Sequence, residues 1–213
     1  MKWEKLLSIV GDEPVFSSSL LMAGNISPAE NRRQLSRWVR AGRIIRLRRG
    51  LYLLAPPYRK IDPHPFLLAN AMKAASYVSL QSALAYYGMI PEYTPVTTSV
   101  TTGRPENLAT ASGTFYFSHI KRSWFSGYRQ LEVMPGQSAF LANPEKCLLD
   151  LVYLTPGGDK MGYLRGLRLQ NLDLINLAEL SRIVEVSGRP KLIRAAEHIK
   201  LLTAEEKEEY KEL

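Results

Sequence analysis

The sequence contains a single cysteine, Cys147, and no long hydrophobic run. One cysteine excludes an internal disulfide, which fits a reducing compartment. No apolar run approaches the roughly 18–20 residues that a membrane span requires. The segment from Met1 to Val10 carries Lys2, Glu4 and Lys5, so it lacks the continuous apolar core of a signal peptide. Because 46% of the residues are hydrophobic and 23% are charged, wholesale disorder is also excluded, and we expect a cytoplasmic globular protein.

The sequence also lacks the motifs of common catalytic and metal sites. His64, His119 and His198 are far apart, and no second cysteine exists to build a zinc site. No glycine-rich nucleotide-binding motif is present. Cys147 lies on the apolar side of a predicted helix, which favours a core position over a nucleophile. The segment Glu205-Glu206-Lys207 resembles the E-x-K of metal-dependent nucleases but lacks a strand context. These absences predict a protein that is not an enzyme and that needs no cofactor or metal.

A third absence concerns charge, because one segment of eighteen residues contains no acidic side chain. The chain has 28 lysines and arginines against 20 aspartates and glutamates, a net charge of +8. Removing the eight arginines of this segment leaves 20 against 20, so the segment holds the whole positive excess. A charge so concentrated attracts a polyanion and indicates nucleic-acid binding. The eight arginines are Arg32, Arg33, Arg37, Arg40, Arg43, Arg46, Arg48 and Arg49.

The first half of this segment is predicted to be a helix. Ser27, Pro28 and Glu30 form a capping box, and the helix should run to about Ala41, with Gly42 after its end. At 100° per residue its apolar stripe and its basic residues lie on opposite faces, as in a recognition helix. The apolar stripe is Leu35, Trp38 and Val39; the opposite face is Arg33, Ser36, Arg37 and Arg40, with Gln34 and Arg32 on its flanks.

The second half of the segment changes to the alternation of a strand. Ile45 and Leu47 fall on one face and Arg46 and Arg48 on the other, and Arg49-Gly50 supplies a turn. This pattern predicts a β-hairpin with a basic tip, the wing of a winged helix-turn-helix. We expect Arg32, Arg46, Arg48 and Arg49 to contact DNA phosphates, and Arg33, Gln34 and Arg37 to contact base edges. The predicted DNA-binding residues are Arg32, Arg33, Gln34, Ser36, Arg37, Arg40, Arg46, Arg48 and Arg49.

The remaining sequence predicts a proline-rich linker and a second, mixed domain. Four prolines between Ala55 and Pro65 predict a stiff connector, so we expect domains at 1–55 and 66–213 with a linker at 56–65. The fold class is α+β, a winged helix-turn-helix followed by a small sheet with helices and a helical C-terminus. A short helix after Phe16 should end at Gly24, Ser79 should cap one helix, and Thr203 should cap the last. Other expected helices span 66–75, 80–87 and 143–153, and expected strands span 95–102, 113–119, 128–134 and 137–141.

Both halves resemble a known family. The first half reads S-P-A-E-N-R-R-Q-L-S-R-W-V-R-A-G-R-I-I-R-L-R-R-G-L-Y-L-L, and it resembles the winged-helix domain of the antitoxins of the abortive-infection AbiE system, a type IV toxin–antitoxin family. In the second half, Tyr77–Leu84, the strand Phe115–His119 and Asn143-Pro144-Glu145-Lys146 before Leu148–Leu151 resemble the same family. The order of these segments carries the resemblance, because no single motif is diagnostic.

The resemblance implies a repressor and antitoxin active in phage defence. The N-terminal domain would bind inverted repeats of double-stranded DNA in the promoter of its own operon. The second domain would antagonise a nucleotidyltransferase toxin without a stable complex being required. The family pattern assigns DNA contacts to the basic helix and wing: Arg32, Arg33, Arg37, Arg40, Arg46, Arg48 and Arg49.

Two other functions remain open from the sequence. One is a nuclease or nucleic-acid-modifying enzyme delivered by the winged helix, although no compact carboxylate cluster supports it. The other is an interaction module whose arginine segment binds an acidic protein.

Overall fold

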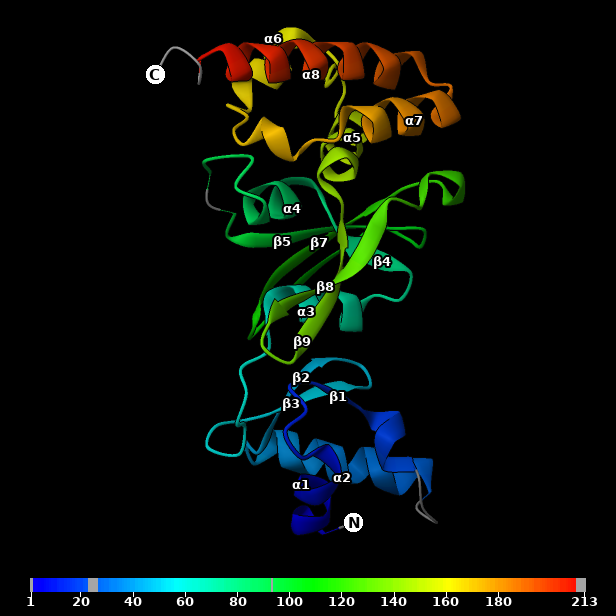
Figure 1. Cartoon of the computed structure of the whole chain (residues 1–213). Helices are drawn as coiled ribbons and strands as arrows, with labels where there is room; N and C mark the ends of the chain where they lie inside the picture. The colour runs from blue at the N-terminus through cyan, green and yellow to red at the C-terminus, as the bar shows by residue number, and fades with distance from the viewer. Residues whose placement is uncertain (1, 23–26, 93, 210–213) are drawn as a thin grey trace.

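The computed structural model describes residues 2–22, 27–92 and 94–209. Figure 1 shows an elongated molecule in which the N-terminal domain occupies one end, a six-stranded sheet the middle, and a layer of helices the other end. The predicted α+β class with an N-terminal winged helix-turn-helix is confirmed. None of the helices in the described ranges is long and apolar enough to cross a membrane.

The N-terminal domain combines two α-helices with a small sheet. Its elements are α1 (Trp3–Val10), β1 (Phe16–Ser17), a 3-10 helix η1 (Ser18–Met22), α2 (Pro28–Arg40), β2 (Ile44–Arg48) and β3 (Leu51–Leu54). The strands are antiparallel neighbours in the order β1-β3-β2. The short helix expected after Phe16 is the 3-10 helix η1, and its expected end at Gly24 lies outside the described residues.

Helix α2 begins and ends where the sequence predicts. The Ser27 hydroxyl accepts a hydrogen bond from the Glu30 N–H at 3.2 Å, and the Glu30 carboxylate accepts one from the Ser27 N–H at 3.3 Å. This capping box satisfies two of the N–H groups that a helix start leaves unpaired. The last helical residue is Arg40, Ala41 is the C-cap, and Gly42 follows with a φ of +66° that favours glycine.

A small core holds α2 against the rest of the N-terminal domain. Leu35 and Trp38 of α2 are buried, as the apolar stripe predicts. The Trp3 ring meets Trp38 edge-on at 5.2 Å, and the Arg43 guanidinium lies 5.2 Å from the Trp3 ring centroid. The buried members of this core are Leu6, Val10, Phe16, Leu21, Leu35, Trp38, Ile44, Tyr52 and Leu54.

The connection between β3 and α3 (Pro65–Met72) also contacts the N-terminal domain. The Tyr58 ring packs edge-on against Trp3 at 4.9 Å, and Lys60 pairs with Asp12 at 2.7 Å. At its end the His64 side chain accepts a hydrogen bond from the Phe66 N–H at 3.2 Å, which caps α3. The proline-rich segment is therefore attached to its surroundings at both ends.

The second domain contains a mixed six-stranded sheet in the order β6-β7-β5-β4-β9-β8. The strands that the sequence predicts are present with small shifts at their ends: β5 (Val96–Thr101), β7 (Gly113–His119), β8 (Tyr128–Met134) and β9 (Gln137–Ala142). Two further strands were not predicted, β4 (Ser76–Val78) and β6 (Glu106–Thr110). β5 pairs with β7 in parallel, which brings the carboxyl ends of these two strands together.

Helices cover this sheet and continue beyond it. They are α4 (Leu80–Tyr86), η2 (Arg122–Trp124), α5 (Pro144–Leu154), α6 (Met161–Gly166), η3 (Leu172–Leu174), α7 (Leu177–Ser187) and α8 (Pro190–Glu209). The expectation that Thr203 caps a last helix is wrong, because Thr203 lies within α8 and its hydroxyl bonds the Ile199 carbonyl at 2.9 Å. Ser79 does precede α4, but its hydroxyl donates to Asp150 at 2.8 Å instead of capping the helix.

The core of the second domain contains a buried ion pair between Lys146 and Asp150 of α5. The Asp150 carboxylate also accepts hydrogen bonds from the Trp124 indole at 2.7 Å and the Tyr77 hydroxyl at 3.0 Å. Burial raises the pKa of Asp150 and lowers that of Lys146. The carboxylate thus ties α5 to β4 and to η2.

Candidate nucleic-acid interface

The exposed face of α2 is a continuous basic surface. The arginines of α2 lie on the side of the helix opposite the buried stripe. They are exposed to solvent, whereas Leu35 and Trp38 are buried in the N-terminal core. The exposed side chains line a shallow depression with a volume of about 410 Å³. The residues that line it are Arg32, Arg33, Ser36, Arg37 and Arg40, and Gln34 lies half-buried at the edge of the helix. Six of the nine predicted DNA-binding residues therefore lie together on one helix.

The guanidinium groups of this face have no anionic partner within the described part of the chain. No ion pair there involves Arg32, Arg33, Arg37 or Arg40, whereas Arg48 and Arg59 elsewhere in the same half of the chain do form ion pairs. Arg37 and Arg40 also lie in the last turn of α2, where the partial negative charge of the helix end favours cations. The face thus displays four positive charges that a polyanion can approach without first breaking ion pairs.

The β2–β3 hairpin has two different faces. Directly opposed residues of antiparallel strands share a face, so Ile44 with Leu54 and Arg46 with Tyr52 form one side. Ile44, Leu54 and Tyr52 belong to the N-terminal core, and Arg46 is exposed on that side. Arg49 is exposed in the turn at the tip.

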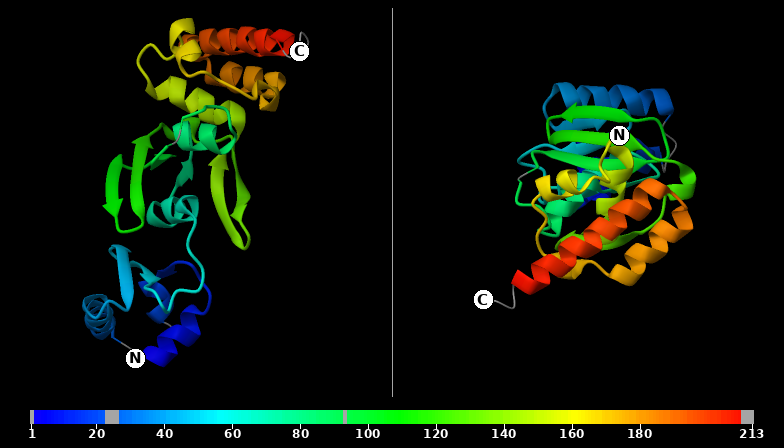
Figure 2. Two further views of the ribbon diagram at one scale, coloured as in Figure 1. Left: turned by 90° about the vertical axis from the view of Figure 1, so that its left-hand side faces the viewer. Right: turned by 90° about the horizontal axis from the view of Figure 1, so that it is seen from above.

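The opposite face of the hairpin packs against the second domain. Leu47 and Leu53 belong to the core of that domain, and Ile45 and Leu51 pack against its edge. The left view of Figure 2 shows the hairpin rising from the N-terminal helices toward the six-stranded sheet. The hairpin therefore contributes side chains to the cores of both halves of the molecule.

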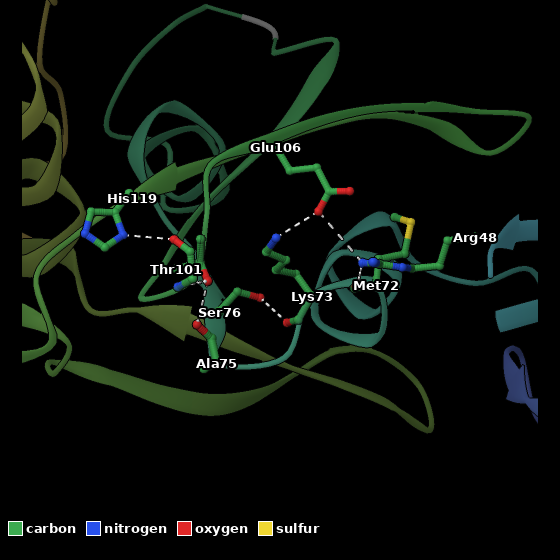
Figure 3. Close-up of polar contacts among 9 residues, drawn as sticks. Arg48, Met72, Lys73, Ala75, Ser76, Thr101, Glu106 and His119 are labelled. Carbon is green, nitrogen blue, oxygen red and sulfur yellow. Dashed lines mark hydrogen bonds and ion pairs between the residues drawn. The ribbon is translucent and has the colours of Figure 1, made fainter. Parts of the chain in front are cut away.

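Arg48 lies on this inner face and is held there by polar contacts (Figure 3). Its guanidinium donates a hydrogen bond to the Met72 carbonyl at the end of α3 and lies 4.0 Å from the Glu106 carboxylate. Lys73 donates to the same carboxylate at 2.8 Å. The hydrogen bond from Lys73 is the main cause that lowers the pKa of Glu106 below its ordinary value of 4.5.

These contacts revise the predicted wing. The hairpin and its turn exist as expected, but its inner face is covered by the second domain and the Arg48 guanidinium is occupied. The Arg48 side chain is 36% exposed but has partners within the chain, so we expect Arg46 and Arg49 rather than Arg48 to contact DNA. Sequence reasoning missed Lys73 and Glu106, because neither residue belongs to a motif. The one signal in the sequence was that the hairpin is apolar on both faces, at Ile44-Ile45 and Leu51–Leu54.

The residues considered for catalysis have structural partners. His64 caps α3, His119 bonds the Gly103 carbonyl at 2.9 Å and His198 bonds the Asp159 carbonyl at 2.9 Å. Cys147 is fully buried, and burial raises the pKa of its thiol. Within the described ranges, no group of three or more His, Cys, Asp and Glu side chains is placed to hold a metal ion.

The segment that resembled a nuclease motif lies on α8 and not on a strand. Glu205 pairs with Arg165 at 2.8 Å, and Glu206 accepts a hydrogen bond from the Leu172 N–H at 2.8 Å. Both residues line an open pocket of about 610 Å³ between α6 and α8, together with Arg165 and Arg168. The two carboxylates thus connect α8 to α6 and to the start of η3.

Comparisons with known proteins agree with this arrangement. The crystal structure of the RV2827C protein from Mycobacterium tuberculosis superposes with a TM-score of 0.58 over 92% of this chain and 75% of that chain, at 16% sequence identity. At that identity the likeness concerns the fold alone. No curated protein matches the chain in sequence. Residues 4–55 match the family model described as transcriptional regulator, AbiEi antitoxin. The resemblance expected from the sequence is thus confirmed for the N-terminal domain, whose residues match the AbiEi antitoxin family of transcriptional regulators.

Proposed function

We propose that the protein is a sequence-specific DNA-binding repressor and the antitoxin of an AbiE-type system, and that it is not an enzyme. The observation that carries the proposal is the exposed face of α2, where four arginines without acidic partners in the described structure lie within a segment that matches a regulator family. The ligand is double-stranded DNA, and no cofactor or metal takes part. The proposal includes a cytoplasmic location, because the promoter DNA lies there.

The dimensions and chemistry of α2 suit the major groove. A helix of 13 residues is about 20 Å long, and the groove is about 12 Å wide, enough to admit one helix. Arg33, Gln34 and Arg37 are assigned to base edges, where a good bidentate contact contributes about 1–3 kcal/mol of discrimination. Ser36 lies among them and adds a hydroxyl. The assigned phosphate contacts are Arg32, Arg40, Arg46 and Arg49.

The proposed biological role is that of the AbiEi antitoxins, whose family model residues 4–55 match. The DNA target is a set of inverted repeats in the promoter of the protein's own operon, so binding represses that operon. The functional partner is a nucleotidyltransferase toxin encoded with it, and the second domain carries the antitoxic activity without a stable complex. The system thereby serves abortive infection, a defence against phage.

A binding assay with two duplexes tests this function. A gel shift compares the DNA immediately upstream of the gene with a scrambled duplex of the same composition, over a series of salt concentrations. We expect tighter binding to the upstream DNA, with log K falling by about 0.9 per phosphate contact against log salt. Equal affinity for the two duplexes would contradict sequence-specific repression. The matched control is an Arg33→Ala/Arg37→Ala variant, which should bind both duplexes alike.

A further inference from the structure

A second cluster of basic residues lies at the carboxyl ends of strands β5 and β7. These strands are parallel neighbours with Thr101 opposite His119, so the segments that follow them leave the sheet side by side. One segment carries Arg104 and the other carries Lys121 and Arg122. We call these three cations together with His119 the sheet-end patch. The sequence contains the run His119–Arg122, but only the fold adds Arg104 to it.

Hydrogen bonds hold the two segments against each other. The His119 ring nitrogen Nδ1 lies 2.9 Å from the Gly103 carbonyl oxygen, and the Ile120 N–H donates to the Thr101 carbonyl at 2.9 Å. The Gly103 N–H donates to the Thr101 hydroxyl at 3.0 Å. Figure 3 shows His119 beside Thr101, on the opposite side of the view from Arg48. These hydrogen bonds give the backbone beneath the sheet-end patch a defined conformation.

Two buried side chains anchor the cations from below. Ile120 is fully buried before Lys121, and Trp124 is buried after Arg122. The Trp124 indole donates to the Asp150 carboxylate at 2.7 Å, and the Lys146 ammonium lies 4.2 Å from the Trp124 ring centroid. The buried ion pair of α5 thus fixes the 3-10 helix η2 that carries part of the patch.

The patch has a positive charge that neighbouring acids do not neutralise. Arg104, Lys121 and Arg122 are exposed, and none forms an ion pair among the residues that the structure describes. Only three acidic residues occur between 66 and 142, and each is engaged elsewhere. Glu92 pairs with Arg168, Glu106 pairs with Lys73, and Glu132 accepts a hydrogen bond from the Gly136 N–H.

The composition of the patch favours a phosphate backbone over a protein partner. Protein interfaces depend on a central cluster of apolar or aromatic side chains. In segments 101–105 and 118–123 the one large hydrophobic residue is Ile120, and it is buried. The exposed side chains include the three cations and the Ser123 hydroxyl, which are groups that contact phosphates in DNA complexes.

We propose that the sheet-end patch binds the phosphate backbone of duplex DNA outside the segment that α2 reads. The inference rests on the proposed function, because α2 supplies the sequence preference and the patch adds affinity without sequence preference. A repressor with this second contact holds a longer stretch of promoter than one helix covers.

The test uses the full chain and two duplexes. One duplex is limited to the α2 site, and the other contains the same site with extended flanks. The variant is Arg104→Ala/Lys121→Ala/Arg122→Ala. The control variant Lys160→Ala/Lys200→Ala/Lys207→Ala removes the same charge from exposed positions on and before α6 and α8. On the extended duplex we expect the patch variant to bind more weakly than the wild type. The slope of its log K against log salt should be smaller by up to about 2.7, which is about 0.9 for each of three phosphate contacts. The short duplex and the control variant should show no change.

Two results would overturn the proposal. In the first, the patch variant binds the extended duplex with the same affinity and the same slope of log K against log salt as the wild type. In the second, the control variant loses as much affinity for the extended duplex as the patch variant does. Failure of the proposed function appears differently, as equal affinity of the wild-type protein for promoter and scrambled DNA. In that case a loss of non-specific binding in the patch variant alone would still support the patch. If the triple variant lacks a thermal unfolding transition, Lys121→Ala/Arg122→Ala gives the same test with a slope change of up to about 1.8.

Discussion

Helix α2 and the β2–β3 hairpin carry arginines at nearly the same density but have different surroundings. The basic face of α2 is open to solvent, and its arginines have no acidic partners in the described structure. The hairpin lies between two cores, with Ile44 and Tyr52 on one side and Leu47 and Leu53 on the other. Its Arg48 is bound to Met72 and Glu106. The comparison teaches that a run of like charges defines a basic segment, whereas the apolar pattern between the charges decides which of them lack partners within the described structure.

The largest effect is expected from the base-reading positions of α2. Replacing Arg33 and Arg37 by alanine removes two contacts that contribute about 1–3 kcal/mol each to discrimination. We expect the preference for promoter over scrambled DNA to fall by about 30-fold or more, with the protein still folded. A gel shift with both duplexes measures this ratio. An unchanged ratio would mean that α2 does not read the bases.

A core substitution tests whether the β2–β3 hairpin packs into the core of the second domain. Leu53 is fully buried in the core of the second domain, so Leu53→Ala should lower the free energy of unfolding by about 2–5 kcal/mol. Arg46→Ala on the same hairpin is the control and should change it by less than about 0.5 kcal/mol. Urea denaturation measures both. A loss below about 1 kcal/mol for Leu53→Ala would indicate a hairpin that is free of the second domain.

Arg48 should matter for stability more than a wing residue would. Arg48→Ala removes a hydrogen bond to the Met72 carbonyl and a partly exposed ion pair, together about 1 kcal/mol. For a chain of 213 residues this lowers Tm by about 2–4 °C. Thermal unfolding checks the shift, with Arg49→Ala as the matched exposed control. Equal Tm values for the two variants would contradict the inner position of Arg48.

The smallest effect is the pH dependence of the Glu106 contacts. The pKa of Glu106 is lowered in the folded protein, so its contribution to stability is fully present above the ordinary value of 4.5 and is lost as the pH falls through the lowered pKa. Glu106→Gln should therefore be less stable than wild type at pH 7, by less than about 1 kcal/mol. This difference should disappear as the pH is lowered below 4.5 in urea titrations. A difference that stays constant with pH would exclude the ionic contribution.

The local elements were predictable from the sequence because their signals are local. The capping box Ser27-Pro28-Ala29-Glu30 fixed the start of α2, and the alternation in 113–119 and 128–134 gave the full extents of β7 and β8. β4 and β6 were missed because β4 has only three residues and β6 contains Glu106, Asn107 and Ala109, which have low β-propensity.

The candidate site was predictable in its α2 half only. Helical periodicity places Arg33, Ser36, Arg37 and Arg40 on one face without any tertiary information. The partners of Arg48, in contrast, are 24 and 58 positions away along the chain, at Met72 and Glu106. No local pattern connects these positions, because their proximity depends on how the hairpin packs between two cores.

The most direct measurement compares two single-charge variants in one assay. Arg40→Ala removes a positive charge from α2, and Arg48→Ala removes one from the inner face of the hairpin. Binding to the upstream promoter DNA is measured for both and for wild type over a series of salt concentrations. The slope of log K against log salt should fall by about 0.9 for Arg40→Ala and stay at the wild-type value for Arg48→Ala. Equal falls for the two variants, or a fall for Arg48→Ala alone, would contradict the assignment of DNA binding to α2.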